Sequence, residues 1–283
     1  MINLIKLFTF STLINIVYDQ TDFCKARCDL KINNCCRYNS VAKSCQESFK
    51  SIPLSNETLR NFVMKLNVMR NNVAGGLHER DEFKGVQASN MHMVSYSFEL
   101  QYSSNCWATQ CRVHLSRCKA VADGLVAETI FHRALKDNEP EDEQILFDSL
   151  DYFFFQARDY INISEYLENN LAIKEILRGP VQYVGCTAVV FLEFNIRVAL
   201  VVCHYFPTVR KIGEKVFEKG VPCSKCDLDL KCSTQAKYQH LCGRTRPMFE
   251  DIWYPLFPPI TNAARGNRKN TPILIVLFLI SIN

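Results

Sequence analysis

The sequence predicts a mixed fold in which helices pack on an antiparallel sheet, and three observations lead to this expectation. Segments with helical periodicity come first along the chain, and two long apolar segments of β type follow them. The third observation is the presence of fourteen cysteines among 283 residues. That density is typical of proteins that fold outside the reducing cytosol and are held by disulfides. A helical part followed by a late hairpin favours a layered α+β domain.

Composition narrows the class of protein. Apolar residues make up 48% of the chain and charged residues 22%, which is typical of a globular domain. The net charge is +4 and no long block of Lys and Arg occurs, so nucleic acid is not an expected partner. Without its two apolar ends the chain has roughly 250 residues, enough for one domain with a small appendage.

The two ends carry short apolar segments. Residues 1–20 contain one lysine before the apolar stretch 7–17, and we interpret them as a signal peptide with cleavage between Val17 and Thr21. An uncleaved anchor or a buried helix is the alternative. Residues 272–283 would reach only about 17 Å as a helix, too short to span a bilayer.

Small residues and a polar spacer precede that apolar tail, in residues 262–271. This arrangement is typical of a glycolipid (GPI) anchor signal, which would be the protein's sole contact with a membrane. The alternative is a tail that is trimmed or without order. Residues 246–271 are expected to form a linker before the tail. Two sequons, at Asn56 and Asn162, are candidate glycosylation sites of a secreted protein.

The helical elements are expected in the following order. Residues 21–50 read as a cysteine-rich arm without clear periodicity. Pro53 and Ser55 then open a helix with apolar residues at helical spacing, which Gly75 and Gly76 end. A short alternating segment at 91–96 precedes another helix from Glu99. Further helices are predicted over 142–157 and 171–177.

The late part of the chain is predicted to form a hairpin. Residues 181–192 and 197–206 are rich in Val, Phe and Ala, and residues 193–195 separate them. Cys186 and Cys203 would face each other across the pair. A disulfide there would close a short loop and contribute on the order of 3 kcal/mol.

Landmarks along residues 22–243 match a known family. They are Asn67 with Arg70, Asn71 and Val73 to Gly76; Ala88, Asn90 and Met91 before Glu99 and Leu100; Trp107, Ala108, Gln110, Cys111 and Cys118; Val184 to Cys186; Leu200 to Tyr205; and Gly220, Pro222, Cys223, Ser224, Cys226, Cys232, Leu241 and Cys242. In this order they resemble the cysteine-rich secretory/antigen 5/pathogenesis-related (CAP) superfamily, and within it the insect antigen 5-like branch of the venom allergens.

The resemblance implies an α-β-α sandwich whose three- or four-stranded sheet is mainly antiparallel. The CAP domain would span residues 51–210 and a cysteine-rich extension residues 211–245. It also implies the disulfides Cys24–Cys36, Cys28–Cys118, Cys45–Cys111 and Cys186–Cys203. The tail residues Cys223, Cys226, Cys232 and Cys242 would pair among themselves. Cys35 and Cys106 are left over, and one further bridge between them would complete the set.

Many members of the family hold a divalent metal with two His and two acidic residues, chemistry that suits zinc. The matching positions here are Leu115, Leu125, Ser149 and Ala172. His114 lies one residue from the first position, which turns a helical side chain by about 100 degrees. The resemblance therefore implies that the metal site is lost, and we expect no metal, no cofactor and no catalytic residue.

Other local patterns have simpler interpretations. Pro222 to Cys226 matches half of a zinc-deaminase motif but lacks its His-x-Glu partner, so a disulfide is expected. His204 neighbours Cys203, but adjacent strand residues point to opposite faces, so a core or surface histidine is expected. His78 to Arg80 reads as a solvated loop. Asp148 and Ser149 lack a hydrolase turn, and the aromatic run 152–155 is expected to pack on the sheet.

The function expected from the sequence is binding. A secreted or surface-attached, non-enzymatic protein of the antigen 5 type would bind an extracellular protein or a lipid through its surface and loops. Two alternatives remain open, a lipid- or sterol-transfer protein and a divergent extracellular hydrolase.

Overall fold

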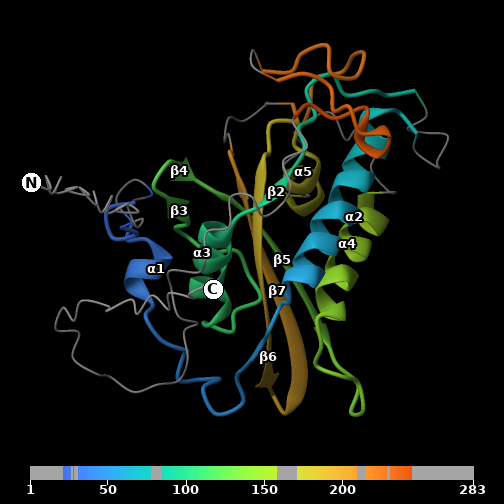
Figure 1. Ribbon diagram of the computed structural model, residues 1–283. Coiled ribbons are helices and arrows are strands. Elements are labelled where there is room, and N and C mark those ends of the chain that lie inside the picture. Colours follow the sequence, from blue (N-terminus) through green and yellow to red (C-terminus); the bar gives the residue numbers. More distant parts are fainter. Residues whose placement is uncertain are drawn as a thin grey trace, which may run out of the picture.

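The structure is a computed structural model of the 283-residue chain (Figure 1). It describes residues 22–26, 28, 31–77, 85–157, 171–208, 215–227 and 230–243. The predicted signal peptide, linker, apolar tail, the sequon at Asn162 and the loop 78–80 lie outside these residues. Within the described part, no helix is both long and apolar enough to cross a membrane.

A central sheet has four antiparallel strands in a row. Their order is β1 (Lys50–Ile52), β6 (Tyr183–Glu193), β7 (Ile196–Phe206) and β5 (Ala127–Ala134). The two-residue strand β2 (Ser95–Tyr96) adds a short parallel pairing to the start of β6. A separate small hairpin joins β3 (Ala120–Val121) to β4 (Gly124–Leu125). The predicted mainly antiparallel sheet is confirmed, with β2 as an additional fifth member.

Helices cover both faces of this sheet (Figure 1). On one face lie α2 (Asn56–Ala74), α4 (Gln144–Ala157) and α5 (Leu171–Leu177); on the other lie α3 (Phe98–Ala108) and the four-residue α1 (Asn34–Arg37). Side chains of β6 and β7 alternate between the two layers: Ala188 and Val201 pack in the cluster with α2 and α4, and Val189 and Val202 in the cluster with α3. The α-β-α sandwich is confirmed.

The hairpin of β6 and β7 forms the middle of the core. Its register runs from Tyr183 opposite Phe206 to Glu193 opposite Ile196, and most of its residues are buried. Both faces are covered by helices, which is why the sequence shows nearly continuous apolar runs here instead of alternation. Phe194 and Asn195 form the turn, both with positive φ. The predicted hairpin is confirmed.

Helix α2 shows why the sequence prediction succeeded. Ser55 caps its start, because the side-chain oxygen accepts a hydrogen bond from the Thr58 amide at 3.0 Å. Gly75 is the C-cap, and Gly76 follows with φ +68°, a conformation that glycine adopts without strain. The predicted helices at 99, 142–157 and 171–177 correspond to α3, α4 and α5. Strand β5 was not predicted.

All fourteen cysteines form disulfides in the structure. Three pairs tie the N-terminal arm to the end of α3 and the segment after it: Cys28–Cys118, Cys35–Cys106 and Cys45–Cys111. The other four are Cys24–Cys36, Cys186–Cys203, Cys223–Cys232 and Cys226–Cys242. The expectation of a disulfide-rich domain is confirmed.

Candidate functional site

The resemblance assigns four positions to metal ligands, and these hold Leu115, Leu125, Ser149 and Ala172. Leu115 is exposed in the segment after α3, and Leu125 lies in β4. Ser149 is buried in α4, where its hydroxyl donates to the Leu146 carbonyl at 2.6 Å. Ala172 is part of α5, but its side chain lies outside the described residues.

His114, the histidine nearest to the first of these positions, is exposed. Its backbone carbonyl accepts a hydrogen bond from the Trp107 indole at 2.9 Å, and its ring lies edge-on to that indole. Among the described residues, the one group of three potential metal ligands is Cys223, Cys226 and Cys242. All three are in disulfides, which removes the thiolates that a metal would need.

Asp148 and Ser149 do not cooperate as a catalytic pair. The Asp148 carboxylate accepts hydrogen bonds from Arg133 at 2.9 Å and from Gln144 at 3.1 Å, at the surface of α4. Ser149 points into the core, to the carbonyl of its own helix. In the aromatic run 152–155, Phe153 is buried whereas Tyr152 and Phe155 are exposed. The run therefore packs on the sheet only in part.

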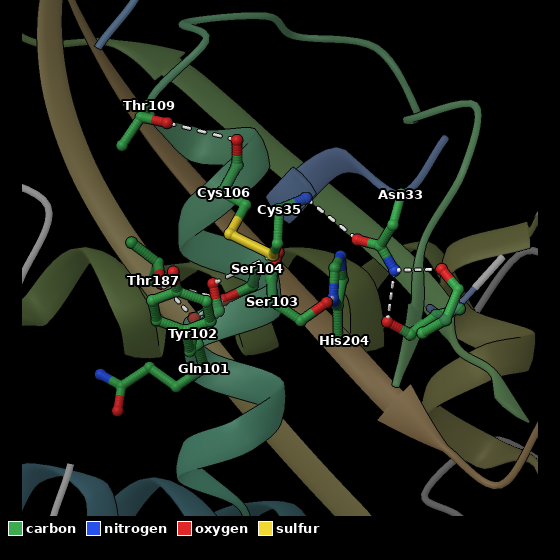
Figure 2. The surroundings of a disulfide bond; sticks show 12 residues. Asn33, Cys35, Gln101, Tyr102, Ser103, Ser104, Cys106, Thr109, Thr187 and His204 are labelled. Atoms are coloured by element: carbon green, nitrogen blue, oxygen red, sulfur yellow. Dashed lines mark hydrogen bonds between the residues drawn. A yellow bond between two sulfur atoms is a disulfide. The ribbon is translucent and has the colours of Figure 1, made fainter. Parts of the chain in front are cut away.

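The structure instead brings together three polar side chains that no sequence motif connects. The Ser103 hydroxyl of α3 lies 3.0 Å from Nδ1 of His204 in β7, and Nε2 of His204 lies 2.9 Å from the Glu128 carboxylate in β5. Figure 2 shows Ser103 and His204 pointing toward each other between helix and strand. We call these three residues the buried polar chain.

Glu128 is held as an anion by further donors. The Ser116 amide and hydroxyl donate to its two oxygens at 2.6 and 2.8 Å, and the Lys119 ammonium lies 3.6 Å away. Burial by itself raises the pKa of Glu128, but the hydrogen bond from His204 and the charge of Lys119 outweigh it, so the pKa is lowered. Burial also lowers the pKa of His204, so its imidazole is neutral. Nδ1 then accepts from Ser103, and Nε2–H donates to Glu128.

A hydroxyl, an imidazole and a carboxylate in sequence are the components of a serine hydrolase. Here, however, Ser103 is 1% exposed, His204 0% and Glu128 3%. Ser103 sits within a helix whose backbone amides are engaged in helical hydrogen bonds, so they offer no donors for an oxyanion. The arrangement cannot receive a substrate in this form. Its physical role is to connect α3, β5, β7 and the segment at Ser116 through satisfied buried hydrogen bonds.

The N-terminal arm covers this chain on one side. Cys35 in α1 is bonded to Cys106, one turn after Ser103 in α3 (Figure 2). Asn33 caps α1 by accepting from the Cys35 amide, and its side-chain amide donates to the carbonyls of Ala26 and Ala120. The Cys35–Cys106 disulfide therefore holds α1 beside the buried polar chain.

The most exposed apolar side chain of the described part lies at the opposite end of the hairpin from Cys186. Phe194, in the turn, is 92% exposed, and its neighbours Ile196 and Leu192 are about half exposed. We call these three residues the hairpin tip. The sequence predicts residues 193–195 only as a connection, because a turn and a binding loop have the same local signal.

Comparisons with known proteins agree with this fold. No protein-family model matches the chain. Venom allergen 5.01 of Dolichovespula maculata is 25% identical over 229 residues, which cover 76% of this chain and 97% of that protein. Venom allergen 5 of Polistes dominula is 23% identical, with the same coverage.

Solved structures give the same result for the fold. The crystal structure of NaASP2 with Zn²⁺ aligns with a TM-score of 0.52 and 22% identity, over 68% of this chain and all of that one. BmVAL-1 aligns with a TM-score of 0.53 and 19% identity, over 69% of this chain and 97% of that one. With the sandwich, the disulfides and the ordered landmarks, these similarities lead to one conclusion: the chain has the CAP fold and is similar in sequence to the antigen 5 venom allergens.

Proposed function

We propose that the protein is an extracellular CAP protein that acts by binding a partner, without catalysing a reaction. The seven disulfides and the similarity to venom allergens indicate the extracellular location. Two features support binding over catalysis. The described residues that match the family's ligand positions carry no His or acidic side chain, and the buried polar chain is closed to substrate.

The observation that carries the proposal is the hairpin tip. Leu192 is paired with Arg197, and Glu193 with Ile196, so Leu192 and Ile196 lie on opposite faces with Phe194 at the apex. The tip is therefore apolar on both sides and at its end, which suits insertion into a pocket of a partner.

The hairpin tip by itself lowers the stability of the folded protein. Phe194 has φ +49°, a left-handed conformation that costs a bulky residue about 1–2 kcal/mol. Its ring gains almost nothing from burial, because it is 92% exposed. An Asn-Gly turn would make the same hairpin without either cost. A residue that is both strained and exposed is better explained by a contact with another molecule.

The base of the tip is rigid, which lowers the entropy cost of binding. The Ser48 hydroxyl accepts a hydrogen bond from the Leu192 amide at 2.9 Å. On the other strand, Arg197 bonds the Glu141 carboxylate at 2.7 Å and the carbonyls of Lys136 and Glu139. The tip is thus presented at the end of a fixed hairpin.

A protein is the favoured partner, and a lipid is the alternative. Residues 137–143 follow Lys136 beside Arg197 and contain five acidic side chains and no Lys or Arg. Glu139 is paired with Arg133, and Glu141 with Lys50 and Arg197. The other three carboxylates of the segment would repel an anionic bilayer and attract a protein pocket with a basic rim. Attachment to a cell surface through residues 272–283 is proposed from the sequence alone; release by phosphatidylinositol-specific phospholipase tests it.

The experiment compares two variants with matched chemistry. Phe194→Ser removes the apex of the tip, and Val221→Ser removes an equally isolated side chain that is 70% exposed in the C-terminal extension. Proteins retained from the native extracellular fluid by the immobilised wild type are identified, and their affinity for each variant is measured. Loss of a binding anchor should weaken the affinity by roughly 30-fold for Phe194→Ser. Equal affinities for both variants would refute the role of the tip.

The two alternative functions have separate tests. A lipid-transfer role would appear as sterol or fatty acid that co-purifies with the native protein, detected by mass spectrometry. A hydrolase would appear as labelling of the folded protein by a fluorophosphonate, lost in the Ser103→Ala variant. Labelling of Ser103 would contradict the non-enzymatic proposal.

A further inference from the structure

We propose that a basic surface beside α3 binds a sulfated polysaccharide. This surface consists of five exposed cationic side chains from two segments, Lys31, Arg37, Lys43, Arg112 and Arg117. It lies on the α3 face of the sandwich, whereas the hairpin tip lies at one end of the sheet (Figure 1). The inference is therefore independent of the binding role proposed for the tip.

The two segments form one surface because they are cross-linked. Cys28–Cys118 and Cys45–Cys111 join the arm to the segment that follows α3. The Asn34 amide also donates to the Cys118 carbonyl at 3.2 Å. Cations that are far apart in the sequence are thus held at fixed relative positions.

Acidic side chains flank the two segments in the sequence, at Asp29, Glu47, Glu99 and Asp123, but none lies within them. Residues 31–46 and 100–122 contain no Asp or Glu. Within the described part of the chain, no carboxylate lies within 4.0 Å of any of the five cations. The acidic segment 137–143 belongs to the β5–α4 connection instead. Basic and acidic side chains are therefore concentrated in different parts of the protein, although the net charge is only +4.

Two of the guanidinium groups are held in place by aromatic rings. Arg37 lies 5.4 Å from the Tyr38 ring, Tyr38 lies 5.9 Å from Trp107, and Arg112 lies 5.6 Å from the Trp107 ring. These contacts form a row with a guanidinium at each end. Stacking leaves the N–H groups at the edge of each guanidinium available, and that planar fork matches the oxygens of a sulfate group.

The features of the surface favour a sulfated polysaccharide over other polyanions. Trp107 is 2% exposed, so its ring cannot stack on nucleic-acid bases. An anionic bilayer is the stronger competitor, since Ile32 and Leu115 are exposed among the cations. A bilayer site usually presents aromatic side chains at the headgroup level, however, and here the indole is buried. An extracellular protein meets sulfated polysaccharide chains, and a row of fixed cations suits a linear polyanion.

The test is the affinity of the full-length protein for heparin, measured between 0.05 and 0.3 M NaCl, on the order of physiological salt. If each cation displaces counterions as on a single-stranded polyanion, the slope of log affinity against log salt should be about −3 to −4. The double variant Arg112→Ser/Arg117→Ser should reduce this slope by about 1.4. Its affinity near 0.15 M salt should fall roughly 25-fold, about fivefold per charge.

The control removes the same charge elsewhere. Lys219→Ser/Lys231→Ser changes two exposed lysines of the C-terminal extension and should leave the heparin affinity within about twofold. Loss of binding to desulfated heparin supports the proposal. Three results would overturn it: no heparin binding near 0.15 M salt, an equal loss in the control variant, or binding to phosphatidylserine vesicles without binding to heparin. Near-UV circular dichroism of each variant verifies that the fold is intact.

Discussion

The disulfide between Cys35 and Cys106 allows a quantitative test of how the N-terminal arm is held. Cys106 is fully buried in α3, and Cys35 belongs to the short helix α1. Replacing both by alanine removes the bridge without leaving a reactive thiol. We expect the variant to fold with the other six disulfides and to unfold at a lower urea concentration.

The magnitude follows from the loop that the bridge closes in the unfolded chain. The sequence separation is 71 residues, which alone would give about 4.5 kcal/mol. The bridge Cys45–Cys111 shortens this path, because the chain from Cys35 to Cys45 and from Cys111 back to Cys106 makes a loop of only about 16 residues. The entropic loss is then about 3 kcal/mol. The two lost sulfur atoms add a smaller packing contribution.

Urea unfolding at equilibrium, in the absence of reductant, measures this loss. The slope of free energy against urea should also rise, because the unfolded chain exposes more surface when the bridge is absent. A loss below about 1 kcal/mol with an unchanged slope would refute the reasoning, since the arm would then be restrained equally without this disulfide.

Three further predictions concern the core and the surface. Burial lowers the pKa of His204 from 6.5, and the pKa of Glu128 lies below 4.5, so both groups bind more protons when unfolded. Stability should fall as the pH drops below about 6.5 and again below about 4.5; a urea midpoint that rises from pH 7.5 to 5.5 would contradict this. The Arg70 guanidinium is buried and donates hydrogen bonds to backbone carbonyls, and burial lowers its pKa to about 9. Arg70→Met should therefore lower the free energy of unfolding by roughly 3–5 kcal/mol, measured by thermal unfolding. A loss near zero would show that these hydrogen bonds do not stabilise the fold. Asn56 is exposed in the first turn of α2 and is expected to carry an N-linked glycan. The secreted protein should then lose mass on treatment with an N-glycosidase, and Asn56→Gln should abolish this loss. A loss of mass that persists in the variant would place the glycan elsewhere.

The helices and the hairpin could be predicted because their signals are local. The cap at Ser55 and the stop at Gly75 define α2 within a few residues of its true ends. Strand β5 was missed because its buried residues include Glu128 and Thr129, which interrupt the apolar pattern of a core strand. Glu128 can be buried there only because Lys119 and His204 compensate its charge, and no local pattern indicates those partners.

The sites depend on contacts between distant segments, which explains why sequence reasoning found less of them. Ser103 is 101 residues from His204, and Glu128 is 76 residues from it. The sequence left open whether His204 is a core or a surface histidine; its burial decides for the core, and its partners could be identified only from the sheet register. The exposure of Phe194 likewise depends on where the hairpin ends relative to the helices that cover it.

The central claim, that the protein works by binding and not by catalysis, is tested most directly by comparing Phe194→Ser with Ser103→Ala in one assay. The assay measures the affinity of each variant for the partner that the wild-type protein retains from native extracellular fluid. We expect Ser103→Ala to keep wild-type affinity and Phe194→Ser to lose roughly 30-fold. Full binding by Phe194→Ser, together with hydrolysis of the partner that depends on Ser103, would contradict it.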